Sequence, residues 1–362
     1  MVCIQHSTVQ YSTVLLNSTD IKISFILTFC NYHLFNTDGV LNTLSAPALQ
    51  QAAATIATVE ARHASYLSLL NQAIPFPNVL DPVKSPAQVV TDISSILASC
   101  NNPSAIPLQE PLQRSNLTSA HSETNDELQN DIAVLQYALA LEHLESTFYN
   151  QYAGITSQEF QQAGYSSNTY DYIALIRSHE SQHVQILSSV LKQLGATPVP
   201  ACNYTFPPTI STVQFINYAA ALENTGVSAY DGTVNAITNA TLQQAAVQIA
   251  TVEARHAAYL NNLLQQSPFP NATDVAETPS QVAAIASQFI SSCPYDLNSA
   301  INSIKLSYSG QGGNGSNSGA TAGTSTGGSG TSGIPPPSSG SQHTTAASVM
   351  IVVIGSVMLY GL

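Results

Sequence analysis

Six residues of the types that bind metal ions follow one another in a regular order, a single glutamate and then a Glu-x-x-His motif, twice over. They are Glu142, Glu180, His183, Glu223, Glu253 and His256. Residues three apart lie on the same face of a helix, so each Glu-x-x-His motif presents a carboxylate and an imidazole side by side. The same order of ligands is typical of four-helix bundles that hold two metal ions in the core.

Apolar residues surround these glutamates, as Leu141, Leu222 and Ile249 illustrate. The glutamates therefore lie on or beside the stripe that each helix buries, where carboxylates are normally absent. Four buried carboxylates repel one another unless cations neutralise them, and two divalent ions supply the four positive charges. Oxygen and nitrogen ligands suit iron or manganese, so the sequence predicts a site for two Fe or Mn ions.

The choice of the first ligand has one alternative. Glu145 lies one helical turn beyond Glu142 and competes with it for this position. We prefer Glu142 because the pattern Tyr-Ala-x-Ala-Leu-Glu ends on it and recurs before Glu223, whereas the residue that matches Glu145 is Gly226.

Four neighbours of the predicted ligands are candidates for supporting roles. Tyr149 and Tyr230 each follow a single glutamate by seven residues, and they either hydrogen-bond a ligand carboxylate or are core tyrosines below the site. Of these two interpretations we favour core tyrosines. His143 and His179 adjoin ligand positions, point elsewhere on their helices, and are expected to touch the ligands from outside or to lie on the surface.

The elements that must position these residues are four long helices and one shorter helix. Capping residues and breakers predict them at about 124–150, 169–194, 211–237, 239–266 (with Asn239 or Thr241 at its start) and 279–292. The connection at 195–210 is long for a helix–helix loop. A crossover of this kind keeps the second and third helices of a bundle parallel.

An internal repeat precedes the bundle. Residues 39–100 align without gaps with residues 232–293, and between 49 and 67 only three of 19 positions differ. The first copy therefore supplies a second version of the last bundle helix, which carries Glu60 and His63. These two residues are at most two of the six ligands that a site needs. They form no site unless another chain supplies the rest. It is either a decayed tandem duplication or a truncated copy joined to translated non-coding sequence at 1–38; we favour the second explanation.

Charge and cysteine content narrow the class of protein. Lys and Arg number 8 against 21 Asp and Glu, with a formal net charge of -13, which argues against nucleic acid as a partner. Arg62 and Arg255 are expected to pair with surface or outer carboxylates. Cys202 follows the second long helix and Cys293 ends the last helix, so we predict a disulfide between them, with two unrelated thiols as the alternative.

The C-terminal part predicts attachment to a membrane. Residues 309–345 are rich in Gly, Ser, Thr and Pro, which is typical of a flexible stalk, and residues 346–362 are apolar to the end. This pattern predicts a glycolipid (GPI) anchor signal, with a tail-anchored helix as the alternative. An extracellular, cell-surface glycoprotein is therefore expected, although the apolar run at 22–30 is a poor signal peptide.

These observations divide the chain into six segments: 1–38 unassigned, 39–100 truncated repeat, 101–124 linker, 125–293 bundle, 294–345 disordered stalk and 346–362 hydrophobic tail.

With all six ligand positions filled, residues 125–293 resemble the ferritin-like superfamily, and they look closest to fungal stress-response and plant desiccation-related proteins with a secreted ferritin-like domain. The resemblance implies an all-α, ferritin-like four-helix bundle with a long crossover and a dinuclear iron or manganese centre.

The resemblance leaves two functional hypotheses. One is a stress-response oxidoreductase that oxidises metal (a ferroxidase) or consumes O₂ or peroxide, for example as a catalase. The other is a non-catalytic stress or cell-wall protein that uses the bundle as a scaffold.

Overall fold

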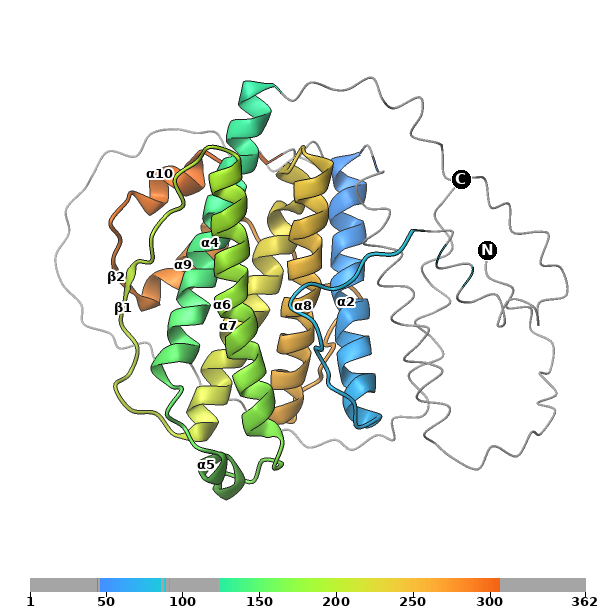
Figure 1. The fold of residues 1–362 in the computed structure, drawn as a ribbon, viewed down its shortest axis with the longest axis vertical. Helices are drawn as coiled ribbons and strands as arrows, with labels where there is room; N and C mark the ends of the chain where they lie inside the picture. Colours follow the sequence, from blue (N-terminus) through green and yellow to red (C-terminus); the bar gives the residue numbers. More distant parts are fainter. Residues whose placement is uncertain (1–43, 45, 86–87, 89–90, 92–123, 307–362) are drawn as a thin grey trace, which may run out of the picture. The chain divides into compact units, whose positions relative to one another are not determined.

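The computed structural model describes residues 44, 46–85, 88, 91 and 124–306, which all belong to one compact unit (Figure 1). The predicted segments 1–38, 101–124 (except Thr124) and 346–362 lie outside these residues. In chain order the elements are α2 (Pro47–Leu70), α4 (Asn125–Gln151), α5 (Ser157–Gln162), α6 (Thr169–Gln193), β1 (Asn203–Tyr204), α7 (Thr212–Thr233), the 3-10 turn η4 (Val234–Ala236), α8 (Ala240–Leu263), α9 (Pro279–Ala286), the 3-10 turn η5 (Ser287–Phe289), β2 (Ile290–Ser292) and α10 (Leu297–Asn302).

Helices α4, α6, α7 and α8 form the bundle, and the predicted all-α class is confirmed. Their starts follow from capping residues. Thr124 and Ser211 each accept a hydrogen bond from the backbone N–H three residues on, in reciprocal capping boxes that open α4 and α7. The Asn239 side chain accepts from the N–H groups of Thr241 and Leu242, so Asn239 opens α8.

The long crossover between α6 and α7 runs along the outside of α4. Near the middle of α4, Gln136 Nε2 donates to the carbonyl of Thr197 at 2.8 Å. At the end of α4, the Tyr152 hydroxyl donates to the carbonyl of Pro207 at 2.5 Å. The crossover therefore returns the chain to the end at which α6 began, and α7 runs parallel to α6 (Figure 1).

The bundle interior has two apolar layers with a polar band between them. Aromatic residues such as Phe148 and Phe215 fill the layer near α5. Aliphatic residues such as Leu139 and Leu191 fill the layer at the other end. The predicted ligands lie between these layers in sequence on every helix, so each is held at one level of the bundle by well-packed side chains on both sides.

The region after α8 differs from the prediction of one helix over 279–292. Helix α9 ends at Ala286, and residues 290–292 form strand β2, antiparallel to β1 in the crossover. Cys202 and Cys293, next to these strands, form the predicted disulfide. The short sheet and the disulfide together tie the crossover to the end of the repeat.

The folded part also extends beyond Cys293, where the sequence predicts a stalk from residue 294. Helix α10 contains the buried Ile301, and Asn130 of α4 accepts the backbone N–H of Lys305 at 2.7 Å. Residues 294–306, which the sequence assigns to the stalk, are therefore folded against the bundle. Within the part of the chain that the structure describes, no helix is both long and apolar enough to span a bilayer.

The first repeat copy forms helix α2, which packs along α8 in the same direction (Figure 1). Near their N-termini, Gln50 Nε2 donates to Gln243 Oε1 at 3.5 Å. Near their C-termini, Ser65 Oγ donates to the carbonyl of Arg255 at 2.9 Å. Small residues, including Ala57, Ala61, Ala254 and Ala257, let the two helices approach closely.

Replacing both Cys202 and Cys293 by alanine is expected to lower the free energy of unfolding by about 2–4 kcal/mol, because the bond closes a loop with a sequence separation of 91 residues. Urea unfolding of the oxidised wild type and the double variant measures this difference. Reduction of the wild type should produce a similar loss, and a double variant as stable as the wild type would contradict the prediction.

Candidate metal centre

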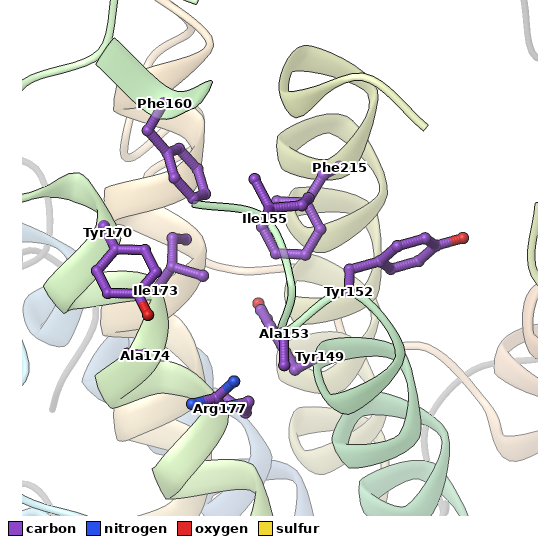
Figure 2. A pocket seen from close by; sticks show the side chains of 10 residues that line it. All are labelled: Tyr149, Tyr152, Ala153, Ile155, Phe160, Tyr170, Ile173, Ala174, Arg177 and Phe215. Atoms are coloured by element: carbon purple, nitrogen blue, oxygen red, sulfur yellow. The ribbon is translucent and has the colours of Figure 1, made fainter. Parts of the chain in front are cut away.

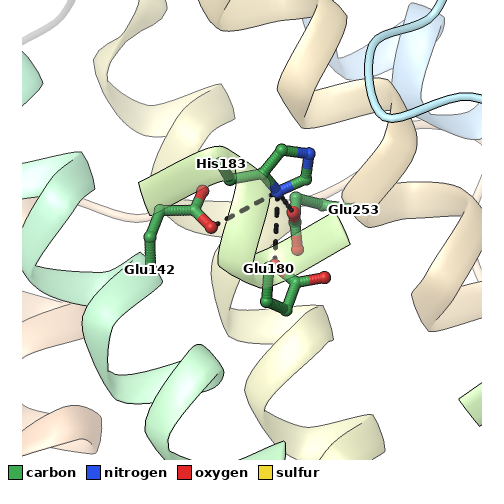
Figure 3. Close-up of side chains that lie close together, drawn as sticks. All are labelled: Glu142, Glu180, His183 and Glu253. Carbon is green, nitrogen blue, oxygen red and sulfur yellow. Dashed lines mark hydrogen bonds and ion pairs between the residues drawn. The ribbon is translucent and has the colours of Figure 1, made fainter. Parts of the chain in front are cut away.

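The six predicted ligands converge in the polar band, where each is at most 1% exposed. They form two overlapping groups whose donor atoms lie within 4.8 Å of one another. The groups are Glu142, Glu180, His183 and Glu253 (Figure 3), and Glu180, Glu223, Glu253 and His256. Glu180 and Glu253 belong to both groups. The two groups therefore offer two adjacent cation positions, and these two carboxylates face both positions.

Each histidine turns one ring nitrogen toward the carboxylates. His183 Nδ1 lies 3.3 Å from Glu142, 3.2 Å from Glu180 and 2.9 Å from Glu253, as the dashed lines in Figure 3 show. His256 Nδ1 lies 3.1 Å from Glu180 and 3.2 Å from Glu223. In the absence of another cation, a protonated Nδ1 is the positive charge available to these carboxylates.

The other ring nitrogen of each histidine is held from outside the group. His183 Nε2 lies 2.8 Å from the carbonyl oxygen of Val79, and His256 Nε2 lies 3.0 Å from Nδ1 of His179. A carbonyl can only accept, so Nε2 of His183 carries the hydrogen. Outer hydrogen bonds of this kind leave Nδ1 directed at the centre and are typical of histidines that bind metals. His179 thus contacts a predicted ligand from outside, one of the two places expected for it.

Several carboxylate oxygens in the centre have no hydrogen bond. Among the described residues, Oε2 of Glu142, Oε1 of Glu180 and both side-chain oxygens of Glu253 are buried without a hydrogen-bond partner, although His183 or His256 lies within ion-pair distance of three of them. Buried polar atoms are normally satisfied, and leaving a charged one unsatisfied is costly. The donor set therefore fits cations held by oxygen and nitrogen atoms.

Tyr149 and Tyr230 hydrogen-bond the carboxylates, which corrects our preference for core tyrosines without contact to the site. The Tyr149 hydroxyl donates to Glu223 Oε1 at 2.6 Å, and the Tyr230 hydroxyl donates to Glu142 Oε1 at 2.5 Å. Each tyrosine thus reaches from one helix to the single glutamate of another. Burial, with the adjacent Glu223 or Glu142, raises the pKa of both hydroxyls, so both remain protonated donors at neutral pH.

Glu145 is a fifth carboxylate at the centre rather than a replacement for Glu142. It is buried and faces Gly226, where an added Cβ would lie 3.0 Å from Glu145 Oε1 and 3.4 Å from Glu253 Oε2. Burial and the nearby Glu223 and Glu142 raise the pKa of Glu145 well above its ordinary value. The glycine that argued against Glu145 in the sequence is therefore what makes room for it.

Burial and mutual repulsion control protonation in the centre. Burial raises the pKa of Glu142, and burial together with the other glutamates raises that of Glu253. Burial opposes the charged form of both ligand histidines, but adjacent carboxylates outweigh it, raising the pKa of His183 well above its usual range and that of His256 to about 9. Burial and the nearby His256 lower the pKa of His179 to about 3, so it is neutral and can accept from His256.

The remaining candidates lie outside both groups. His143 is half-buried, with Nε2 3.1 Å from the carbonyl of Val199 in the crossover. Arg62 and Arg255 form ion pairs with carboxylates, as expected, but these pairs are buried rather than on the surface. Glu60 and His63 are half-buried and 3.4 Å apart on α2, and neither joins the two groups.

A small pocket lies beside Tyr149, between residues of α4, α5, α6 and α7 (Figure 2). Its lining includes Phe160, Arg177, Phe215 and Tyr149. Because Tyr149 also donates to Glu223, the pocket ends one side chain away from the carboxylates.

Metal binding is expected to release protons and to tighten as the pH rises. Since the pKa of His256 is about 9 and that of His183 is also raised, both rings are protonated at neutral pH and must lose a proton to bind a metal. The stability that these protonated rings contribute is fully present below about pH 6.5 and is lost as the pH rises through their raised pKa values. Titration of Mn²⁺ with a pH-indicator dye, and thermal unfolding with and without Mn²⁺ from pH 6.5 to 9, measure both effects. Binding that weakens over this range would contradict the prediction.

Gly226→Ala is expected to weaken metal binding about tenfold, because the new methyl group displaces the Glu145 and Glu253 carboxylates. Gly154→Ala is the matched control, since no atom of the described residues lies within 4 Å of a Cβ at that position. Equilibrium titration with Mn²⁺ compares the two variants, and equal affinities would show that the space beside Gly226 has no role in metal binding.

Comparison with known families agrees with this architecture. No curated protein matches the chain. Residues 130–266 match the family model described as the ferritin-like domain. The match extends from within α4 to just beyond α8 and includes all six residues of the two donor groups, so the resemblance of the bundle to the ferritin-like superfamily is supported.

Proposed function

We propose that this protein binds two iron or manganese ions in the bundle and uses them in redox chemistry with O₂ or peroxide. The observation that carries the proposal is the pair of donor groups that share Glu180 and Glu253. Glu142 and His183 would complete one group, and Glu223 and His256 the other. Two divalent ions would balance the charge of these four carboxylates, and hard oxygen ligands with one imidazole each favour iron or manganese.

A pair of such ions supplies one-electron steps and binding positions for O₂ or peroxide. The chain's own contribution is to hold the ligands and exclude water. The tyrosine hydroxyls fix the orientation of Glu142 and Glu223, and the apolar layers on both sides prevent bulk water from reaching the carboxylates. Tyr149 also stands between the small pocket and Glu223, which supports the pocket as the route for a small oxidant.

The proposal extends to location. The stalk and the apolar tail at 346–362 favour attachment at the cell surface through a lipid anchor, and the disulfide between Cys202 and Cys293 supports an oxidising compartment. A surface protein that consumes peroxide would suit a role in the stress response.

The repeat provides a matched pair of variants to test the centre. Glu253→Gln removes a carboxylate shared by both groups, whereas Glu60→Gln changes the equivalent residue of the first copy. After loading with Fe²⁺ or Mn²⁺, the full chain and Glu60→Gln are expected to contain about two ions, and Glu253→Gln is expected to lose at least nine-tenths of them. Elemental analysis of the desalted proteins measures this content.

Turnover distinguishes the two functional hypotheses. We expect the loaded full chain and Glu60→Gln to evolve O₂ from peroxide or to consume O₂ with Fe²⁺, as followed with an oxygen electrode, and Glu253→Gln to be inactive. Stoichiometric metal without either reaction would favour the non-catalytic scaffold. A full chain that retains no metal would overturn the proposal.

A further inference from the structure

Two buried ion pairs join the repeat copies, each between the arginine of one copy and the aspartate of the other. Arg62 of α2 contacts Asp274, which follows α8, with Nε and Oδ2 2.8 Å apart. Arg255 of α8 contacts Asp81, which follows α2, at 2.7 Å. Arg62 and Arg255 occupy equivalent positions of the repeat, as do Asp81 and Asp274. Each arginine therefore binds the aspartate of the other copy, so the segment after each helix crosses to the other helix.

Backbone contacts follow the same exchange. The N–H of Asp81 donates to the carbonyl of Gln248 on α8 at 3.3 Å, and the N–H of Asp274 donates to the carbonyl of Thr55 on α2 at 3.1 Å. Gln248 Nε2 also donates to the carbonyl of Asp81 at 2.6 Å. The segment Pro75–Asp81, which we call the crossing segment, is thus fixed to α8 at its far end.

Phe76 in the crossing segment covers the ligand histidine of α8. It is fully buried, and its ring meets the ring of His256 edge-on with centroids 4.9 Å apart. It also lies 6.1 Å from the ring of His179, which supports His256 from outside, and 5.5 Å from that of Tyr259. A side chain of the first copy therefore forms part of the wall around the candidate centre in the bundle.

Val79 in the same segment supplies the hydrogen bond that orients His183. Its carbonyl oxygen lies 2.8 Å from Nε2 of His183, whose Nδ1 faces the carboxylates of Glu180 and Glu253. Each of the two ligand histidines consequently touches the crossing segment, one through a ring contact and the other through a hydrogen bond.

The reciprocal segment covers an incomplete set. Phe269, the equivalent of Phe76, meets His63 edge-on at 4.7 Å, but His63 has only Glu60 beside it among the predicted ligands. The exchange thus yields two similar walls, of which one encloses a six-residue centre and the other a pair of residues.

We propose that the crossing segment is the outer wall of the metal centre: Phe76 shields His256 from solvent, and the Val79 carbonyl holds His183 with Nδ1 toward the ions. This role rests on the proposed function, because it assigns to the first copy a part in retaining the metal. The truncated copy thus acts as a positioning element for a site whose ligands all come from the bundle helices α4, α6, α7 and α8.

The test compares matched variants of the full chain. Phe76→Ala opens the wall over the six-residue centre, and Phe269→Ala makes the same change over Glu60 and His63. Asp81→Asn and Asp274→Asn form a second, milder pair, because they weaken the equivalent ion pairs with Arg255 and Arg62. Circular dichroism checks that each variant is folded, and the Asp pair decides the matter if a Phe variant is not.

Release of bound Mn²⁺ to excess chelator is the first measurement. Phe76→Ala and Asp81→Asn are expected to release metal at least tenfold faster than the full chain, and their partners less than threefold faster. Equal release rates within each pair would overturn the proposal.

Modification of histidines in the metal-free chain by diethyl pyrocarbonate, mapped by mass spectrometry at one fixed pH, is the second measurement. We expect Phe76→Ala to raise the modification rate of His256 at least fivefold, and Phe269→Ala to raise that of His63 alone. Unchanged rates would overturn the shielding role. A full chain that binds no metal but shows this pattern would overturn the proposed function and leave the wall supported, so the two failures are distinguishable.

Discussion

The whole arrangement depends on placing five carboxylates and two imidazoles in the interior of a helical bundle. Removing ionised carboxylates from water is expensive, and neighbouring negative charges raise the expense further. Burial and the neighbouring glutamates raise the pKa values of Glu145 and Glu253, and adjacent carboxylates raise those of the two ligand histidines against the effect of burial. Without metal, protonation of these four groups therefore reduces the repulsion. The hydroxyls of Tyr149 and Tyr230 offset part of the free-energy cost of burying the carboxylates by donating hydrogen bonds to them. The remaining buried oxygens without partners explain why cations fit the site.

The sequence was sufficient to predict that these six side chains converge, because helical geometry determines their placement. Spacing of three residues puts Glu180 and His183 on one face, and similar depths in helices joined by capped turns put the four glutamates at one level. The tyrosines were misjudged because only distance along the helix axis was considered. Side chains in a helix lean toward its N-terminus, so Tyr149, two turns beyond Glu142, reaches back to the level of the carboxylates.

Other features have no signal in local sequence. Val79 acts through its backbone carbonyl, which is the same in every residue, and its contact with His183 spans 104 positions. The periodicity of 279–292 is helical, but pairing with the crossover at Asn203 and Tyr204 draws residues 290–292 into a strand. The segment after Cys293 differs from these two, because Leu297, Ile301 and Ile304 recur at helical spacing and pack in one cluster with Tyr137 and Ala229.

The exchange of equivalent contacts between α2 and α8 has a consequence for how this chain tolerates change. An interface in which residue i of one partner meets j of the other, and j meets i, is isologous, and symmetric homodimers are built in this way. Here both halves are encoded in one polypeptide, so they are free to diverge. The first copy, which includes α2, has the contact residues that the second subunit of such a dimer would contribute, including Arg62 and Asp81. It has no counterpart of the ligands that lie on the other bundle helices. The contact between the two copies therefore resembles a dimer interface whose partners belong to one chain. Its stability does not depend on protein concentration, as that of a dimer does.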